Sequence, residues 1–348
     1  MAHSSIKIKI SETWVTVPAL DADGQTIIVK GSRIKVASLN AEDWQEKAVE
    51  NPQRCIARLK EERPSGLRAD IFTFAQKIPD IQPRYNYSME SDSIAAVQTN
   101  SFKEWWEKLP QETRKNVRRS QKRGVIVSVV ELNDAIIQDL VKLNNDAPLR
   151  QGKPYSHYGK TFERVKEDQG SFPDRSGFIC AYLDQELVGY MKIVYRGNVA
   201  SILHFLPKTS HQDKRPANAL MAKAIELCEA KGVSYLIFGK FNYGKKQDNP
   251  LREFKIRNGF EEMLVPRYYV PLTLWGKFCL AAKLHRGLVG ILPRGFITLG
   301  VKVRAKWYTL KNSQRRCSST IERPNRIRQM GRSIPPAGSN QDNSIHDR

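Results

Sequence analysis

The sequence predicts a mixed α/β fold, an α+β sheet with helices packed against it, and three observations favour this class. Between residues 125 and 272, runs with the two-residue alternation of strands follow runs with helical spacing of apolar residues. The first hundred residues are rich in short strand and turn patterns. Apolar residues make up 40% of the 348-residue chain, enough to bury one or two cores, which excludes a wholly disordered protein.

The chain is strongly basic. It has 57 Lys and Arg against 36 Asp and Glu, a net charge of +21, which favours an anionic partner: nucleic acid, a membrane surface or a phosphate-bearing ligand. The five cysteines are scattered and form no pair or cluster with histidine, so we expect neither disulfides nor a metal site. No apolar run reaches the roughly 18 residues of a spanning helix, and the N-terminus lacks a signal pattern. We expect a cytoplasmic protein, with a peripheral place at the inner face of the membrane as the alternative.

The first hundred residues contain short strands joined by turns. Ile6, Ile8 and Ile10 alternate with lysines, the pattern of a strand with one buried face. The elements expected in order are strands over 6–10, 25–30 and 33–38, a helix over 41–50, a strand over 70–75, and a surface connection over 79–92. A change in composition places a domain boundary near residue 100.

Two helices are expected directly after this boundary. Ser101 and Glu104 match a capping box, which predicts a helix start, and Pro110 allows a second start. The second helix carries six cations between Arg114 and Arg123, several of them on one face. This face is either an ordinary solvated surface or a phosphate-binding one, and the sequence leaves both open.

From residue 124 onward, strands and helices alternate. We expect strands over 125–130, 178–183, 187–195, 199–206, 233–239 and 262–272, and helices over 136–144, 161–169, 217–231 and 250–257. Gly232 and Gly259 follow two of these helices, as glycines that end helices do.

The last quarter of the chain has no acidic residue from 263 to 320 but carries eleven cations there. Residues 272–292 mix these cations with large apolar side chains. This composition is typical either of an amphipathic helix on a membrane surface or of a helix packed on the domain with its cations outward. Beyond residue 311 core-forming residues become scarce, which predicts a disordered tail over 311–348 after a basic segment over 273–310.

Several common enzyme motifs are absent. The chain has no G-x-x-x-x-G-K-[ST] loop, no G-x-G-x-x-G, no H-E-x-x-H and no G-x-S-x-G. P-loop nucleotide hydrolysis, dinucleotide redox chemistry, zincin chemistry and nucleophile-elbow hydrolysis therefore lack support.

Three segments in order resemble a GNAT-type acyltransferase domain, closest to the FemAB and CelD-like branch. The segment from Ile179 to Gly189 is similar to the family's hairpin with its closing glycine, and that from Ala219 to Gly232 to the long helix after it. The segment from Asn249 to Phe260 is similar to the last helix with its Gly-Phe exit. Residues 102–106, 109–115 and 124–125 resemble the helical entry to the second half of FemAB-type proteins.

The resemblance implies two tandem GNAT-like halves, a degenerate one over 1–100 and an acyltransferase domain over 101–272. In this fold two adjacent parallel strands separate, and their free main-chain groups bind the pantetheine arm of acyl-CoA. The strands over 199–206 and 233–239 are the expected pair. The sequence departs from the family at the phosphate-binding glycines, where it has Arg215 and Ala217. Lys214, Arg215, Ala217 and Asn218 are the expected donor-binding residues, with the two cations replacing glycine contacts by charge.

Proton transfer is expected from two residues. Lys255 stands four positions before Gly259, where many family members carry a tyrosine general acid, and Phe254 with Lys255 favours the FemAB branch. His204 in a predicted central strand is either a core histidine or a general base. Arg150, His157 and Tyr158 lie in a polar loop suited to acceptor recognition.

The sequence therefore predicts an acyltransferase that uses acyl-CoA, without a metal, on an amine or hydroxyl of a metabolite, glycan or cell-envelope acceptor. Two alternatives remain. One is a FemAB-like transferase that uses aminoacyl-tRNA, and the other is a non-catalytic protein that binds an anionic membrane through residues 273–310, or nucleic acid.

Overall fold

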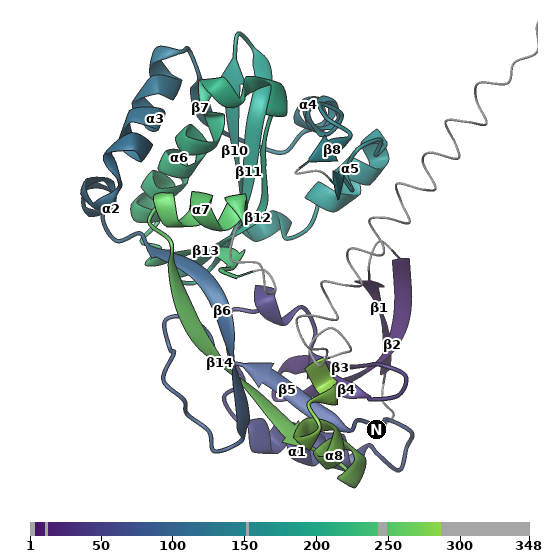
Figure 1. Ribbon diagram of the computed structural model, residues 1–348. Helices are drawn as coiled ribbons and strands as arrows, with labels where there is room; N and C mark the ends of the chain where they lie inside the picture. Colours follow the sequence, from purple (N-terminus) through teal and green to yellow (C-terminus); the bar gives the residue numbers. More distant parts are fainter. Residues whose placement is uncertain (1–3, 11–12, 151–152, 243–248, 287–348) are drawn as a thin grey trace, which may run out of the picture. The chain divides into compact units, whose positions relative to one another are not determined.

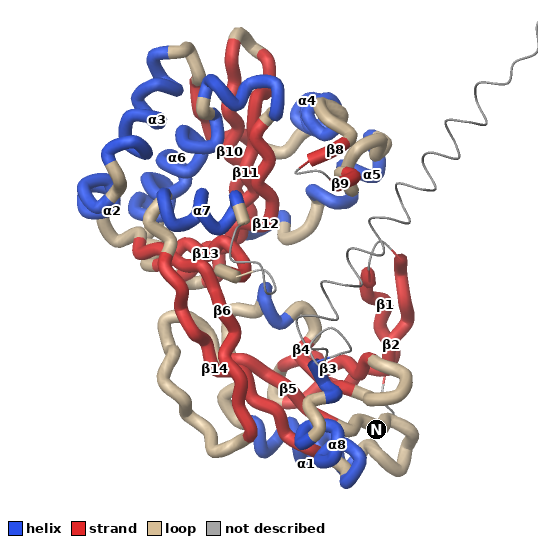
Figure 2. Tube along the Cα trace, in the orientation of Figure 1, coloured by secondary structure: helices blue, strands red, loops and turns tan. Residues whose placement is uncertain are grey.

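A computed structural model describes residues 4–10, 13–150, 153–242 and 249–286 (Figure 1). Within these ranges, one twelve-stranded sheet runs in the order β1-β2-β3-β4-β5-β14-β6-β13-β12-β11-β10-β7. Figure 2 shows this sheet in red, with the helices in blue around it. The mixed α/β class predicted from the sequence is confirmed.

The first half of the chain forms one end of the sheet. Its strands are β1 (Ser4–Ile10), β2 (Thr13–Ala22), β3 (Gln25–Lys30), β4 (Val36–Leu39) and β5 (Ile71–Ala75). The pairs from β1 to β4 are antiparallel, whereas β4 and β5 are parallel. The connection between the parallel strands contains the 3₁₀ turn η1 (Glu42–Trp44) and helix α1 (Pro52–Glu61).

The other end of the sheet has the same plan. Its strands are β7 (Ile126–Val130), β10 (Ser176–Leu183), β11 (Glu186–Arg196), β12 (Val199–Pro207) and β13 (Tyr235–Lys240). They pair antiparallel up to β12, and β12 and β13 are parallel. The helical elements of this part are α2 (Phe102–Lys108), α3 (Gln111–Lys122), α4 (Asp134–Asn144), α5 (Phe162–Gln169), η2 (Pro173–Arg175), η3 (Thr209–Lys214), α6 (Pro216–Ala230) and α7 (Pro250–Arg257). A separate small ladder joins β8 (Leu149–Arg150) and β9 (Lys153–Pro154).

Two long strands join the ends of the sheet. β6 (Ser88–Gln98) and β14 (Glu261–Pro271) pair with each other antiparallel, and each also pairs with one end, β6 with β13 and β14 with β5. Helix α8 (Leu274–Ala281) and the turn η4 (Leu284–Arg286) follow β14. β14, the last strand in the described residues, thus pairs with the half that the chain began. This repeated plan agrees with the expected tandem GNAT-like fold.

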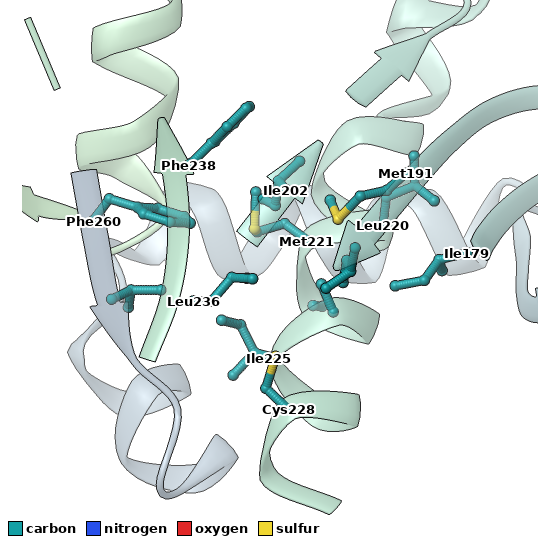
Figure 3. Close-up of a cluster of buried hydrophobic side chains, with 14 of the residues drawn as sticks. Ile179, Met191, Ile202, Leu220, Met221, Ile225, Cys228, Leu236, Phe238 and Phe260 are labelled. Atoms are coloured by element: carbon teal, nitrogen blue, oxygen red, sulfur yellow. The ribbon is translucent and has the colours of Figure 1, made fainter. Parts of the chain in front are cut away.

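Helices cover both faces of the sheet around β10 and β11. Ile179 and Ala181 on β10 belong to the cluster that α6 covers, whereas Cys180 between them belongs to the cluster with α4 and α5. Because successive strand residues point to opposite faces, α6 and the α4–α5 pair lie on opposite sides. Figure 3 shows the α6 side, where Leu220, Ile225 and their neighbours are buried. A third cluster in the first half packs α1 against β5.

Most elements expected from the sequence are confirmed, among them β3, the Ser101 cap of α2 and helix α7. The helix expected over 41–50 is wrong, because Ala41 is left-handed and the chain forms only η1 before turning away. Strand β2 and helix α1 were not expected, and β6 begins inside the predicted connection over 79–92. Residues 287–310 of the predicted basic segment and the predicted tail lie outside the described residues.

Candidate active site

The parallel strands β12 and β13 separate partway along their length. Their ladder joins Val199–Ser201 to Tyr235–Ile237 and then stops, while β12 continues to Pro207. Among the described residues, 202–207 therefore have a ladder partner on the β11 side only. Unpaired main-chain donors and acceptors at such an edge can bind the amides of a ligand. The expected separation of these strands is confirmed.

Aromatic side chains lie across the gap. The rings of Phe205 on β12 and Phe238 on β13 are 5.4 Å apart, edge to face, and Phe254 of α7 is 5.4 Å from Phe205. All three belong to the cluster that α6 covers. A ligand along the β12 edge would therefore contact aromatic rings on this face as well as main chain.

Lys255, a residue of α7, lies beside the same aromatic side chains. Its side chain is fully buried, its Nζ donates a 2.6 Å hydrogen bond to the Lys240 carbonyl at the end of β13, and it lies 4.7 Å from the centre of the Phe238 ring. Burial lowers the pKa of Lys255 to about 8. An amine with a pKa near 8 can give up a proton at neutral pH far more readily than a surface lysine.

His204 lies on the other face of β12. Its ring is 6.3 Å from Tyr190, a member of the cluster with α4 and α5, and 6.1 Å from His157. Burial, followed by the charge of His157, lowers the pKa of His204 to about 4. The imidazole is therefore neutral at physiological pH and can accept a proton.

The predicted acceptor loop packs beside His204. Arg150 donates a 3.0 Å hydrogen bond to the Pro207 carbonyl, and its guanidinium lies 4.7 Å from the centre of the Tyr155 ring. His157 contacts both Tyr155 and His204. Tyr158 differs, because its side chain is 47% exposed. The structure thus brings Arg150, His157 and His204 together and leaves Tyr158 at the surface.

The start of α6 departs from a glycine-rich phosphate loop in the way the sequence indicated. Arg215 is the left-handed N-cap, with φ of 59°, and Pro216 occupies the first helical position. A non-glycine residue is strained in this backbone region. Lys214 forms a 3.2 Å ion pair with Asp213, while Ala217 and Asn218 are half-buried in the first turn. The two cations are near the helix start, but one of them already has an acidic partner.

The sequence reasoning missed a cavity of about 780 Å³ over the middle of the sheet. Its walls include Lys77, Arg196 and Arg267, which come from distant parts of the chain. The sequence did contain one signal for this cavity: Arg267 is a cation inside a largely apolar strand. Within the described ranges, His, Cys, Asp and Glu side chains form no group of three able to hold a metal ion.

Comparison with protein families supports the resemblance. The profile of the Acetyltransferase (GNAT) family matches residues 138–244, which contain both separated strands and α6. Residues 138–244 of this chain therefore form a GNAT-type domain, and the chain is a transferase of the acyl class. The resemblance inferred from the sequence is confirmed. A search of curated proteins finds no significant match.

Solved structures share the fold at low sequence identity. The crystal structure of FemX is 10% identical, with a TM-score of 0.51, and the match covers 77% of this chain and 89% of that one. The C-terminal domain (DUF2156) of a putative lysylphosphatidylglycerol synthetase from Agrobacterium fabrum is 13% identical with a TM-score of 0.50, covering 76% and 87%. At these identities the likeness concerns the fold alone, and it extends over both ends of the sheet.

No helix in the described ranges combines the length and apolar character needed to cross a bilayer.

Proposed function

We propose that the protein transfers an acyl group from a thioester, acyl-CoA, to an amine or hydroxyl of a metabolite, glycan or cell-envelope acceptor. The observation that carries this proposal is the free edge of β12 over 202–207, next to Lys255. In the proposal residues 101–272 perform the chemistry, and residues 1–100 form a degenerate half.

The donor would lie along the β12 edge, with its phosphates near Lys214 and Arg215 and the first turn of α6 at Ala217 and Asn218. Arginine and lysine bind phosphate oxygens through charge-assisted hydrogen bonds, so they can replace a glycine loop. The free main chain would hold the pantetheine amides and fix the thioester close to the acceptor.

The acceptor would approach from the α4–α5 side, where Arg150 and His157 lie, with Tyr158 at the entrance. His204, neutral above its pKa of about 4, would take the proton that the acceptor loses as its new bond to the acyl carbon forms. The C–S bond then breaks, and Lys255 would protonate the departing thiolate. Because His204 and Lys255 belong to clusters on opposite faces, proton uptake and proton delivery are spatially separate.

Calorimetric titration with acetyl-CoA and longer acyl-CoAs tests the donor. We expect binding that is weakened in the Lys214→Ala, Arg215→Ala double variant. We expect no change in Arg257→Ala, because this exposed arginine of α7 is paired with Glu253 outside the gap. Absence of heat with every acyl-CoA would reject the cofactor.

A second candidate donor, aminoacyl-tRNA, is favoured by helix α3. Arg118 lies over Trp106, 5.6 Å from its ring centre, and Lys115, Lys122 and Arg123 are exposed on the same helix. Binding through several phosphates weakens steeply with salt because bound cations are released. Aminoacyl transfer that is steeply salt-dependent, and lost in a Lys115→Glu, Lys122→Glu variant, would support this donor; salt-insensitive transfer from a small thioester would exclude it.

We also propose that α8 contacts an anionic membrane at the cytoplasmic face. Leu274, Trp275 and Phe278 are 88%, 47% and 56% exposed, and the described part of the chain after β14 contains cations and no acidic residue. Exposed aromatic and aliphatic groups among cations are typical of interfacial helices. We expect Leu274→Glu with Phe278→Glu to abolish flotation with anionic liposomes, and Ile126→Glu, at a residue 70% exposed on β7, to leave it intact. Equal flotation of both variants would refute the contact.

A further inference from the structure

The cavity over the middle of the sheet has a floor made by six adjacent strands. Residues two apart in a strand point to the same face, and the floor follows this rule. The floor residues on this face are Val36 on β4, Ile71, Thr73 and Ala75 on β5, Val265, Arg267 and Tyr269 on β14, Asp92 and Ile94 on β6, Ile237 and Gly239 on β13, and Val199 and Ser201 on β12. The cavity is therefore a product of the joined sheet, and neither half contains it alone.

Two cations in its wall are bound to carbonyl groups of one turn. The Lys77 ammonium donates to the Glu42 carbonyl, and the Arg196 guanidinium donates to the carbonyl of the next residue, Asp43. Arg196 also donates to the Gln45 carbonyl at 3.3 Å and to the Ser201 hydroxyl at 2.6 Å. Since the two carbonyl acceptors are consecutive, the two positive charges lie close to each other.

Neither cation has a carboxylate partner within 4.0 Å in the described ranges. Arg267 on the floor is different, because it pairs with Glu42 at 2.8 Å and Asp92 at 2.6 Å. Burial lowers the pKa of both Lys77 and Arg196. The charges of Glu42 and Asp43 oppose this for Lys77, and that of Asp43 opposes it for Arg196, but both pKa values remain lowered. The burial of the two cations is therefore only partly compensated, so this wall favours an added negative charge.

Unused hydrogen-bonding groups lie in the same walls. Arg196 is 8% exposed, and its Nε has no partner in the described structure; the hydroxyl of Thr73, which is 7% exposed, has none either. Native proteins leave few buried polar groups unpaired. Asp43 and Glu46 are carboxylates near the same cations, because Arg196 binds the Asp43 carbonyl and Glu46 lies beside Gly197. Both side chains are exposed.

Part of the floor is apolar. Val199, Ile237, Val265 and Ile94 form one continuous stretch of aliphatic surface beside the cations. A volume of about 780 Å³ lies within the range of small-molecule sites, which combine apolar walls with a few fixed polar groups.

We propose that this cavity binds an organic anion, a carboxylate or phosphate monoester with an apolar body, whose charged group lies between Lys77 and Arg196. The bound anion neutralises the two cations and accepts from their remaining donors, while its body covers the aliphatic floor. Lys77 and Arg196 are not among the residues assigned to the acyl donor or to proton transfer. The cavity does adjoin the gap between β12 and β13, because Ile202 at the start of the free edge and Lys240, whose carbonyl binds Lys255, also line it. The variants below change only Lys77 and Arg196, so loss of anion binding can be distinguished from loss of acyl transfer.

Equilibrium binding of four probes with one alkyl chain tests the proposal: octanoate, octyl phosphate, octanol and octylammonium. We expect the carboxylate, the phosphate or both to bind at least about tenfold more tightly than the alcohol, and the ammonium not to bind. A difference between the two anions identifies which anionic group the site takes. Equal binding of the alcohol, or no binding of either anion, would overturn the proposal.

Variants test the position. Lys77→Met keeps the aliphatic stem and removes the charge, and we expect it to weaken anion binding at least about tenfold, whereas Lys77→Arg retains binding. Lys60→Met, at an exposed lysine of α1, is the matched control and should bind like the parent. Arg196→Gln should weaken anion binding to the same extent, and thermal unfolding checks that this variant folds. If Arg196→Gln does not fold, the Lys77 variants still test the site. Unchanged binding in Lys77→Met would place the anion elsewhere and refute the site.

Discussion

The two ends of the sheet contain the same parallel pair, but within the described residues the strand edge beyond the ladder is much longer at one end: β5 continues by two residues to Ala75, whose amide donates to Glu42 Oε1, and β12 by six. The β4–β5 ladder joins Val36–Ser38 to Ile71–Thr73, and the β12–β13 ladder joins Val199–Ser201 to Tyr235–Ile237. β4 then ends at Leu39, whereas β12 continues to Pro207. The repeated topology supplies a sheet at both ends, and strand length decides which end can offer main chain to a ligand.

The segment that follows β12 is also more extensive than the segment that follows β4. After β4 the chain turns into η1, whose carbonyls Lys77 and Arg196 bind, and then into α1, a helix of 10 residues. After β12 it passes through η3 into α6, which has 15 residues and packs against β10, β11 and β12. The first half thus contributes a wall of the central cavity, and the second contributes the acyltransferase domain.

The largest expected effect compares a buried lysine of α7, in the second half, with an exposed lysine of α1, in the first half. Lys255→Met in α7 should lower kcat by about 10²- to 10⁴-fold, the usual size of a lost general acid. Lys60→Met, at an exposed lysine in the last turn of α1, should leave kcat unchanged.

The pH profile gives the role of Lys255. A general acid must be protonated, so activity should fall as pH rises through about 8, the pKa of Lys255, and this limb should be absent in Lys255→Met. Steady-state kinetics across this pH range measures it. An identical upper limb in the variant would contradict the assignment.

Core truncations compare the stability of the two halves. Leu220→Ala in α6 and Leu59→Ala in α1 remove side chains that are 0% and 2% exposed, and each should lower the free energy of unfolding by about 2–5 kcal/mol. Because one sheet joins the halves, both should shift the same cooperative transition in chemical denaturation. Two separate transitions, each sensitive to one variant, would show that the halves fold independently.

Acid should destabilise the β12 end through His204. Its pKa is about 4 in the folded protein, against about 6.5 for a histidine in an unfolded chain, so below pH 6.5 the unfolded chain binds the proton first. Stability should fall as pH drops from about 6.5 to about 4, by about 2 kcal/mol between pH 7 and pH 5. Denaturation curves of the parent and of His204→Asn measure this, and an equal loss in both would assign the acid sensitivity to other groups.

The smallest expected effect is at the helix caps. The Asn51 side chain accepts a 3.1 Å hydrogen bond from the Arg54 amide at the start of α1, whereas Arg215 provides no side-chain cap for α6. Asn51→Ala should cost about 1 kcal/mol in chemical denaturation. Arg215→Ala removes no cap, so it should lower the free energy of unfolding clearly less. An equal loss of stability in both variants would contradict the claim that only α1 has a stabilising side-chain cap.

The sequence predicted helices and strands well where a capping residue or a regular spacing of apolar residues was clear. Ser101 caps α2 as expected, with its hydroxyl accepting from the Glu104 amide, and α7 spans the predicted residues. Helix α1 had a readable signal in Asn51 followed by Pro52, a cap residue and a favoured first helical residue, and this signal was overlooked. The error over 41–50 has a different cause, because the carbonyls of that turn bind two residues distant in the chain: Lys77, in the connection after β5, and Arg196, at the end of β11.

The candidate site was predictable in part. The loop composition indicated a recognition loop containing Arg150 and His157, but not its position. The structure brings both residues to His204, because the loop packs on β12. The separation of His204 and Lys255 onto two faces could not be predicted, since it depends on the register shift between β11 and β12 near Lys192. A shift of one residue exchanges the faces of a strand.

The order of strands, hairpins and helices, and with it the GNAT resemblance, was set by the spacing of apolar residues and by caps and turns, which act within a few residues. The central cavity and the cation pair in its wall were decided by the tertiary structure alone. Lys77 and Arg196 are far apart in the chain and meet only because β6 and β14 join the two ends into one sheet. Neighbours along the chain cannot encode such a contact, because its partners are fixed only when the whole sheet has formed.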